Sequence, residues 1–269
     1  ARLLCRMPQI GTLARVSTYW AVAAAAFRQY STYRLATAAG VFTNSVFGLI
    51  RASILFAAIT TAGGELSGYT IAQAATYVWL GQALLAPIEA FGTREVSQRV
   101  HQGDVAIDLL RPISFLGLYY AQKLGRSAFL LLGRGIPPML IGALLTGLAL
   151  PEDPWSYPLG MLSLLLAITV AFLADMLVNL AAFWLLETRG LTVVYTALMN
   201  LLSGLLIPIV WFPDWLLAIA RATPFPSMLQ TPIDTLSGRI PPLEALPLLG
   251  VQLGWIALLA LAASATLRA

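Results

Sequence analysis

Six long apolar segments are the feature that most constrains the fold of this 269-residue chain. A hydrocarbon core about 30 Å thick needs about 20 apolar residues per helical span, and backbone polar groups in lipid must be hydrogen-bonded internally. We therefore expect an all-α, polytopic membrane protein with six transmembrane helices. The expected spans are approximately 38–60, 70–91, 116–148, 158–186, 191–210 and 245–266. Charged residues form only 10% of the chain, against roughly 25% in soluble domains, which excludes a soluble globular domain.

The first 37 residues have a different composition, because basic residues alternate there with aromatic ones. This pattern predicts a helix lying in the membrane interface, and the alternative is a weak additional span at 16–27. The expected domains are thus an N-terminal interfacial region, 1–37, and a six-span transmembrane domain, 38–269. Arginines interrupt the N-terminal segment, so a cleaved signal peptide is not predicted.

Basic residues are distributed unevenly between the loops. Most of the 16 Lys and Arg residues fall in the N-terminal segment, in 92–126, in 187–190 and at the C-terminus, whereas the remaining loops carry only Arg221 and Arg239. Positive charge favours the cytoplasmic side of a membrane. We therefore predict that both termini are cytoplasmic. The same distribution explains the net charge of +4 without a nucleic-acid partner.

Residues 93–112 form the largest polar segment between spans. Val96 and Val100 share one face of a predicted helix, and Glu95 with Arg99 has the favourable i,i+4 order. Gly103 is expected to end this helix, and Asp104 to cap the next turn. The segment is either a solvated connector or a short helix that docks a cytosolic partner, and periodicity favours neither. Candidate docking residues are Arg94, Glu95, Arg99, His101, Gln102, Asp104, Asp108 and Arg111.

Residues 207–238 are too apolar for an aqueous loop and too rich in proline for a span. Non-helical backbone at membrane depth is tolerated only where protein or a cavity covers it. A re-entrant pair of short helices fits this composition, and an interfacial loop held by an aromatic belt is the alternative. An aromatic cluster is expected on the outer side. The candidate residues for an outer gate are Trp211, Phe212, Pro213, Trp215 and Phe225.

Polar side chains within the spans are few, and such groups normally face a cavity or a partner. Arg51 lies in the first span, and it is expected either to pair with Asp175 or Glu89 or to line a substrate path. The candidate intramembrane polar residues are Asn44, Arg51, Gln82, Glu89, Asp175 and Asn179.

Motifs for nucleotide or metal chemistry do not occur in these 269 residues: G-x-x-x-x-G-K-[ST], G-x-G-x-x-G and H-E-x-x-H are absent. The sole histidine, His101, has no second ligand nearby, and Cys5 is the sole cysteine. No metal site, no catalytic residue and no enzyme activity of the chain by itself are predicted. Two rival classes stay open, a membrane-embedded lipid-modifying enzyme and an ATP-independent secondary transporter.

Two blocks of residues resemble the small stand-alone permease subunits of type 2 ABC transporters. The first block comprises Gly103-Asp104-Val105, Asp108-Leu109-Leu110-Arg111-Pro112, Tyr119-Tyr120 and Gly125-Arg126. The second comprises Ser203-Gly204, Pro208, Phe212-Pro213-x-Trp215, Pro224-Phe225, Pro232 and Gly238. The resemblance covers nearly the whole chain, and residues 1–37 match in character only.

This resemblance implies six helices, an N-terminal interfacial helix, a coupling helix at about Thr93–Asp108 and re-entrant helices near an outer gate. It implies two ABC ATPase subunits, which bind ATP and Mg, and a second permease, a paralogue or a copy of this chain, within the lipids of the inner (plasma) membrane. Export of drugs, antibiotics, lipids or glycoconjugates is the activity it implies. The sparse polar lining of the spans favours an amphipathic or hydrophobic cargo.

Overall fold

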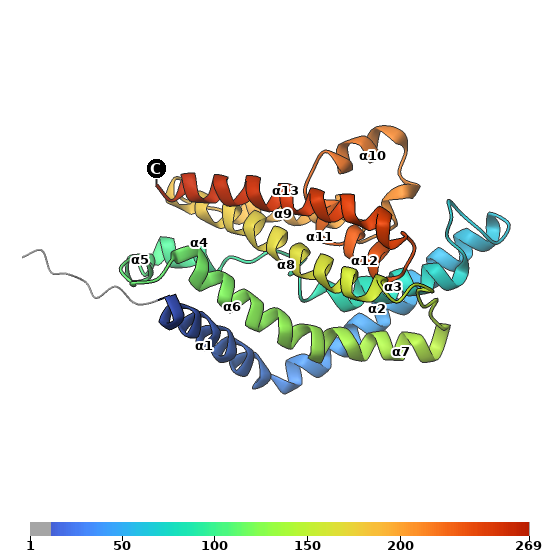
Figure 1. Ribbon diagram of the computed structural model, residues 1–269, viewed down its shortest axis with the longest axis horizontal. Coiled ribbons are helices and arrows are strands. Elements are labelled where there is room, and N and C mark those ends of the chain that lie inside the picture. The colour runs from blue at the N-terminus through green and yellow to red at the C-terminus, as the bar shows by residue number, and fades with distance from the viewer. Residues whose placement is uncertain (1–11, 269) are drawn as a thin grey trace, which may run out of the picture.

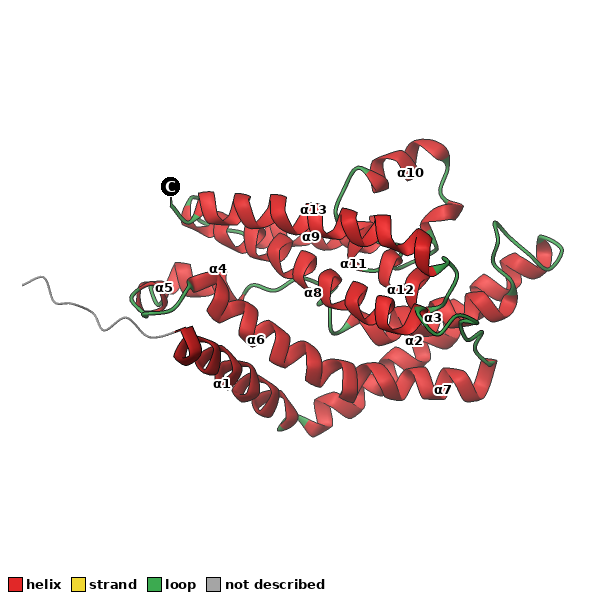
Figure 2. Cartoon of the chain, viewed as in Figure 1, coloured by secondary structure: helices red, strands yellow, loops and turns green. Residues whose placement is uncertain are grey.

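The computed structural model describes residues 12–268 of the chain, and within them every regular element is helical (Figures 1 and 2). The all-α prediction is therefore confirmed for this part of the protein. The elements are α1 Thr12–Ser31, α2 Arg34–Thr61, α3 Ile71–Leu85, α4 Glu95–Gln102, α5 Val105–Leu109, α6 Phe115–Leu130, the π-helical turn η1 Leu131–Gly135, α7 Ile136–Thr146, α8 Ser156–Leu180, η2 Ala181–Phe183, α9 Arg189–Leu202, η3 Ile209–Trp211, α10 Asp214–Arg221, α11 Phe225–Met228, α12 Gln230–Leu236 and α13 Pro242–Thr266.

Four stretches are long and apolar enough to cross a membrane: Arg34–Thr61, Phe115–Thr146, Ser156–Phe183 and Pro242–Thr266. The other two predicted spans, 70–91 and 191–210, are shorter than expected as helices, with 15 residues in α3 and 14 in α9. Helix α3 ends at Leu85, and the turns that follow it include Glu89 and Gly92, whose φ angles are positive. Helix α9 ends at Leu202, shortly before Gly204, which also has a positive φ angle. The remainder of each predicted span is therefore not regular α-helix.

The predicted span 116–148 corresponds to α6, η1 and α7 in succession. The five-residue π-helical turn η1 precedes Pro137 and Pro138, which lie in the first turn of α7. Each proline lacks the amide that an α-helix would use, and the helix changes direction between α6 and α7 (Figure 1). The helix is thus kinked near these prolines, and a π-turn accompanies the kink.

Two clusters of buried apolar side chains form the core. The larger lies between α2, α3, α8, α9 and the short helices α11 and α12, and the smaller lies between α4, α6, α8 and α13. Helix α8 contributes to both clusters. Long helices also expose large apolar side chains, among them Leu144 at 87% and Leu261 at 71%. Such surfaces suit contact with lipid.

Helix α1 lies along α6 (Figure 1). The two backbones approach so closely that a Cβ atom at Gly125 would lie 1.9 Å from the carbonyl oxygen of Ala23. Residues 1–11 of the predicted interfacial region lie outside the described residues. The boundary expected at 37/38 falls within the first turns of α2, which begins at Arg34.

Helices α4 and α5, the start of α1 and the C-terminal end of α13 gather at one end of the molecule (Figure 1). The loops that follow α2 and α7 lie toward the other end. The segments that the sequence predicts to be cytoplasmic are therefore grouped together.

Candidate functional site

The start of α4 is bonded to two polar side chains of α8. Asp175 Oδ1 accepts a 2.8 Å hydrogen bond from the backbone amide of Thr93, and Asp175 Oδ2 accepts one from the Thr93 hydroxyl. Asn179 Oδ1 accepts from the Ser97 amide at 3.0 Å, while its Nδ2 donates to the Thr93 carbonyl at 3.0 Å. Carboxylates and amides at a helix N-terminus satisfy its free amides. Asp175 and Asn179 thus fix where α4 begins.

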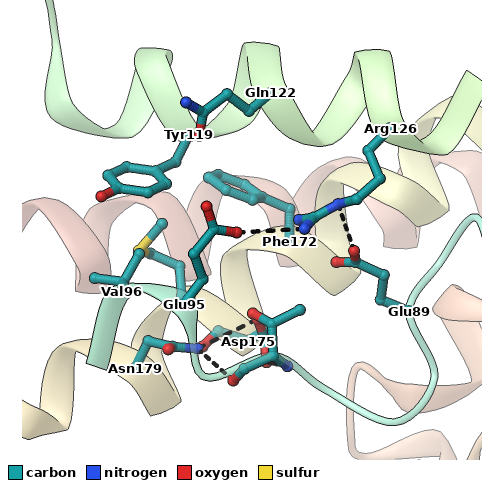
Figure 3. A pocket seen from close by; sticks show the side chains of 11 residues that line it. Glu89, Glu95, Val96, Tyr119, Gln122, Arg126, Phe172, Asp175 and Asn179 are labelled. Carbon is teal, nitrogen blue, oxygen red and sulfur yellow. Dashed lines mark hydrogen bonds and ion pairs between the residues drawn. The ribbon is translucent and has the colours of Figure 1, made fainter. Parts of the chain in front are cut away.

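Glu89 joins the same region to α6. Its Oε2 accepts a 2.7 Å hydrogen bond from Lys123 Nζ. Its Oε1 lies 2.6 Å from Arg126 Nε, and Figure 3 shows this second contact. Glu89 has a φ of +55°, a left-handed conformation that residues other than glycine rarely adopt. We call Glu89, Thr93, Lys123, Arg126, Asp175 and Asn179 the polar node. It joins the end of α3, the start of α4, α6 and α8.

Two charge pairs expected from the sequence are absent from the structure. Arg51 pairs with neither Asp175 nor Glu89, because the acids are engaged within the polar node. Glu95 does not pair with Arg99. Its carboxylate lies 3.3 Å from Arg126 Nη1 instead, since α4 turns that side chain toward α6.

Arg99 pairs instead with Asp108, which orders α5. The Arg99 Nε–Asp108 Oδ2 distance is 2.7 Å, Tyr119 donates to the same oxygen at 2.8 Å, and Arg111 Nε lies 3.5 Å from Oδ1. The hydrogen bond to Asp108 raises the pKa of Arg99 above its ordinary value. Asp108 is buried, so its part is to hold α5 rather than to meet a partner.

Gly103 ends α4 with a φ of +82°, as predicted. Asp104 occupies the N-cap position of α5, but its side chain makes no capping hydrogen bond. That expectation was wrong, because the α-helical backbone angles of Asp104 do not form the extended cap that such a bond requires.

The exposed face of α4 and α5 differs from the one expected. Val96 is buried against the smaller core and Val100 packs beside it, so neither is presented to a partner. Arg94 forms an ion pair with Glu187 at 3.3 Å, and His101 contacts the Leu185 carbonyl at 3.2 Å. Gln102 and Asp104 are exposed.

Three apolar side chains on this face were missed by the sequence reasoning. Ile107, Leu109 and Leu110 are 59, 51 and 84% exposed. The signal that could have revealed them is the high share of apolar residues between Asp104 and Pro112, within the most polar segment of the chain. No group of three or more metal-ligating side chains occurs among the described residues, so His101 stands alone.

A cavity of about 650 Å³ opens between α2, α3, η1 and α9. Four of the six predicted intramembrane polar residues line it, namely Asn44, Arg51, Gln82 and Glu89. Arg134 of η1 and Asn200 of α9 also line it, and we call this space the arginine-lined cavity. Asp175 and Asn179 do not line it, because they bind the start of α4. Neither Arg134 nor Asn200 was predicted as a candidate, although Arg134 is the basic residue nearest the middle of the third predicted span.

The segment 207–238 consists of short helices, as its prolines predict, but its aromatic residues do not form one cluster. Trp211 packs edge-on against Tyr69 and donates to the Leu66 carbonyl, whereas Phe225 packs against Tyr195. Phe212 is buried, Pro213 is exposed before α10, and Trp215 on α10 is 65% exposed. The short helices point these rings in separate directions.

A buried polar network in this segment was not predicted. Gln230 accepts a hydrogen bond from Tyr77 at 2.8 Å and donates one to Asp234 at 2.8 Å. Arg239 Nε donates to Asp234 at 2.9 Å, and its guanidinium lies over the Tyr69 ring. A buried network with all partners satisfied specifies one packing. The segment is therefore fixed to α3 through side chains that hydropathy alone does not reveal.

Several residues of the two resembling blocks have structural roles here. Gly125 allows α1 to approach α6. Arg126 is part of the polar node, and its Nη1 also donates a hydrogen bond to the Tyr30 hydroxyl at 3.0 Å. Tyr119 binds Asp108, and Tyr120 pairs with Thr169 of α8 at 2.7 Å. The first block therefore builds the contacts that hold α4 and α5.

Comparison with protein families supports the resemblance. A family model described as "ABC-2 family transporter protein" matches residues 47–269. No curated protein and no solved structure gives a significant match.

Proposed function

The chain belongs to the ABC-2 family of transporter proteins, and on that premise we propose that it is the permease subunit of an ATP-driven exporter. It is a multi-pass membrane protein of a transport family. Two separate ABC ATPase subunits would bind ATP and Mg, and a second permease would complete the translocation path. The chain itself supplies no hydrolytic chemistry in this proposal.

The observation that carries the proposal is the attachment of α4 to α8 by Asp175 and Asn179. Helix α8 contributes to both apolar cores, so a force on α4 reaches the long helices directly. Ion pairs at Glu89 pass the same displacement to α6 and to the end of α3. Coupling the movement of separate ATPase subunits to the membrane helices requires such a connection between a surface helix and the packed spans.

The docking contact would be made by the exposed apolar side chains Ile107, Leu109 and Leu110 together with the polar residues around them. Apolar anchors surrounded by polar side chains are typical of protein interfaces. Asp108 and Arg99 support this surface from below. The 93–108 segment thus acts as the coupling helix of the proposal.

Six spans are proposed for the membrane domain, formed by α2, α3, α6 to α7, α8, α9 and α13. Helices α3 and α9 would complete their crossings through the turns that follow them, covered by neighbouring protein. The grouping of α4, α5 and the C-terminus supports cytoplasmic termini in the inner membrane, and the short helices 209–236 would lie near an outer gate. The arginine-lined cavity would form part of the path.

The polar node does not favour the alternative of a membrane-embedded enzyme. The space enclosed by the polar node is only about 20 Å³, roughly the room of one water molecule. Its acids are held by hydrogen bonds and ion pairs, which suits positioning rather than chemistry.

Co-purification tests the proposal. The tagged chain is co-expressed with ABC ATPases of the same genome, and we expect an ATPase subunit to co-purify and to hydrolyse ATP in proteoliposomes. Ile107→Asp and Leu110→Asp are expected to abolish this association. Leu150→Asp serves as the matched control, because Leu150 is 71% exposed in the loop after α7. Transport by the chain without any ATPase would contradict the proposal and favour a secondary transporter.

A further inference from the structure

Two arginines reach into the arginine-lined cavity without an acidic partner. Arg51 belongs to α2 and Arg134 to η1. Among the described residues, no carboxylate oxygen lies within 4.0 Å of either side chain. Glu89 lines the same cavity, but both of its oxygens are engaged by Lys123 and Arg126. The cavity therefore carries uncompensated positive charge.

Hydrogen-bonding groups in this cavity are also unused. Arg51 Nε and Nη1, Arg134 Nε, Gln82 Oε1 and Asn200 Oδ1 are buried and have no hydrogen-bond partner. The one hydrogen bond of Arg51 is a long one, 3.5 Å from Nη2 to the Leu206 carbonyl. Buried polar groups are nearly always paired, and a buried charge without a partner is strongly unfavourable. These atoms can form hydrogen bonds or ion pairs with a polar group placed in the cavity.

The local backbone makes room for the guanidinium group of Arg134. Arg134 lies on a π-helical turn, a feature that often marks functional sites. A Cβ atom at Gly40 would lie 2.1 Å from Arg134 Nε, so only glycine leaves room for the guanidinium against α2.

The rim of the cavity is apolar, in contrast to its polar interior. Phe47, Phe91 and Leu206 line it and are 57, 59 and 54% exposed. A guanidinium binds carboxylate or phosphate through paired hydrogen bonds, whereas the apolar rim suits a hydrocarbon chain. A molecule with an acidic head and an apolar tail satisfies both regions.

We propose that the arginine-lined cavity binds the phosphate or carboxylate head group of an anionic amphiphile, with Arg51 and Arg134 as its ligands and the apolar tail at the rim. As a substrate class this rests on the proposed exporter function. Gln82 and Asn200 accept hydrogen bonds from hydroxyl or amide groups of the head. A head group that lacks an anion leaves both guanidinium groups unpaired and binds weakly.

Binding is tested on the purified full-length chain in detergent, without ATP or ATPase. Native mass spectrometry measures dissociation constants for phosphatidic acid and for phosphatidylcholine with the same acyl chains. We expect phosphatidic acid to bind at least about tenfold more tightly, as the loss of one charge-assisted interaction predicts. Arg51→Gln and Arg134→Gln are each expected to remove about tenfold of that affinity. Arg34→Gln, which changes an exposed arginine of the same helix, is expected to leave it unchanged.

Three results would overturn the inference: equal affinity for the two lipids, variants that bind as the unchanged chain does, or inorganic phosphate that competes as well as phosphatidic acid. If Arg51→Gln halved the mass of the complex, the variant would have lost its pairing with the second permease. Arg51 would then be a contact residue for that second subunit rather than a ligand of the head group. Thermal stability of each variant is recorded, and Arg134→Gln tests the site independently of Arg51. ATPase co-purification is measured separately, so failure of lipid binding and failure of the exporter proposal are distinguishable.

Discussion

Asp175 on α8 accepts hydrogen bonds from both the backbone amide and the hydroxyl of Thr93, two residues before α4 begins. A carboxylate in this position neutralises the positive end of the helix and fixes the chain that leads into it. From the sequence, Asp175 is a candidate intramembrane polar residue that either pairs with Arg51 or lines a substrate path, and in the structure it binds the chain that leads into α4. Asp175 holds the surface helix to the membrane domain.

Replacement of this carboxylate should release α4. Asp175→Ala removes two charge-assisted hydrogen bonds and leaves the Thr93 amide unpaired, at a cost of about 3 kcal/mol. We expect a lower unfolding temperature and, in the assembled complex, ATP hydrolysis that no longer depends on the transported molecule. Differential scanning fluorimetry and a coupled ATPase assay measure the two effects. Glu244→Gln, at an exposed acid of α13, is the control, and an Asp175→Ala complex with normal coupling would contradict the anchoring role.

Asp108 and Asp104 provide a matched pair of acids in the same segment. Asp108 is buried and binds Arg99, Arg111 and Tyr119, whereas Asp104 is exposed and caps nothing. Loss of the charge in Asp108→Asn should cost about 1.5 kcal/mol or more, equal to at least about tenfold faster local opening. Hydrogen exchange of residues 103–112 measures this change. Asp104→Asn should exchange as the unchanged chain does, and an equal effect of both variants would exclude Asp108 as the residue that orders α5.

Gly204 is predicted to tolerate no side chain. Its φ is +86°, and a Cβ atom would lie 2.4 Å from Gln230 Oε1 and 2.7 Å from the Tyr77 hydroxyl. Gly204→Ala should therefore disrupt the network between α3 and α12 and cost about 2 kcal/mol or more. Gly254→Ala on α13 is the control, because nothing lies within 4 Å of its added carbon, and helical alanine is favourable. A smaller loss of thermal stability in Gly204→Ala than in Gly254→Ala would refute this role.

The hydropathy of the sequence predicted the helical class and the places of the four longest helices, because a membrane span is specified by local composition. It did not predict that α3 and α9 would be short. Turns follow both helices, with positive φ angles at Glu89 and Gly92 after α3 and at Gly204 after α9, and Glu89 forms ion pairs with distant residues of α6. The gathering of α4, α5 and the C-terminus agrees with the charge distribution between loops.

Side-chain partners were predicted less well than elements. Gly103 ends its helix as glycine should, since that depends on one residue alone. Arg99, by contrast, had an acid four residues before it and one nine residues after it, and the turn at Gly103 brings the second within 2.7 Å. Asn44, Arg51 and Gln82 share a cavity because α2 packs on α3 and η1. Residue spacing within one helix does not predict such contacts between helices.

Glu89 and Lys123 should differ sharply in the cost of their removal. Lys123 is 2% exposed and Glu89 is 16% exposed, and Glu89 is the acid that both Lys123 and Arg126 share. Glu89→Gln leaves two buried cations without this partner, which should cost about 3–5 kcal/mol. Lys123→Met removes one cation but preserves the pair of Glu89 with Arg126, and it should cost about 1 kcal/mol or less because an apolar chain of similar length replaces a desolvated charge.

Adding Lys123→Met to Glu89→Gln should recover part of the lost stability, since one unpaired cation is then absent. Unfolding temperatures of the two single variants and the double variant measure this order, and a double variant less stable than Glu89→Gln would show that Lys123 is held by contacts other than its charge.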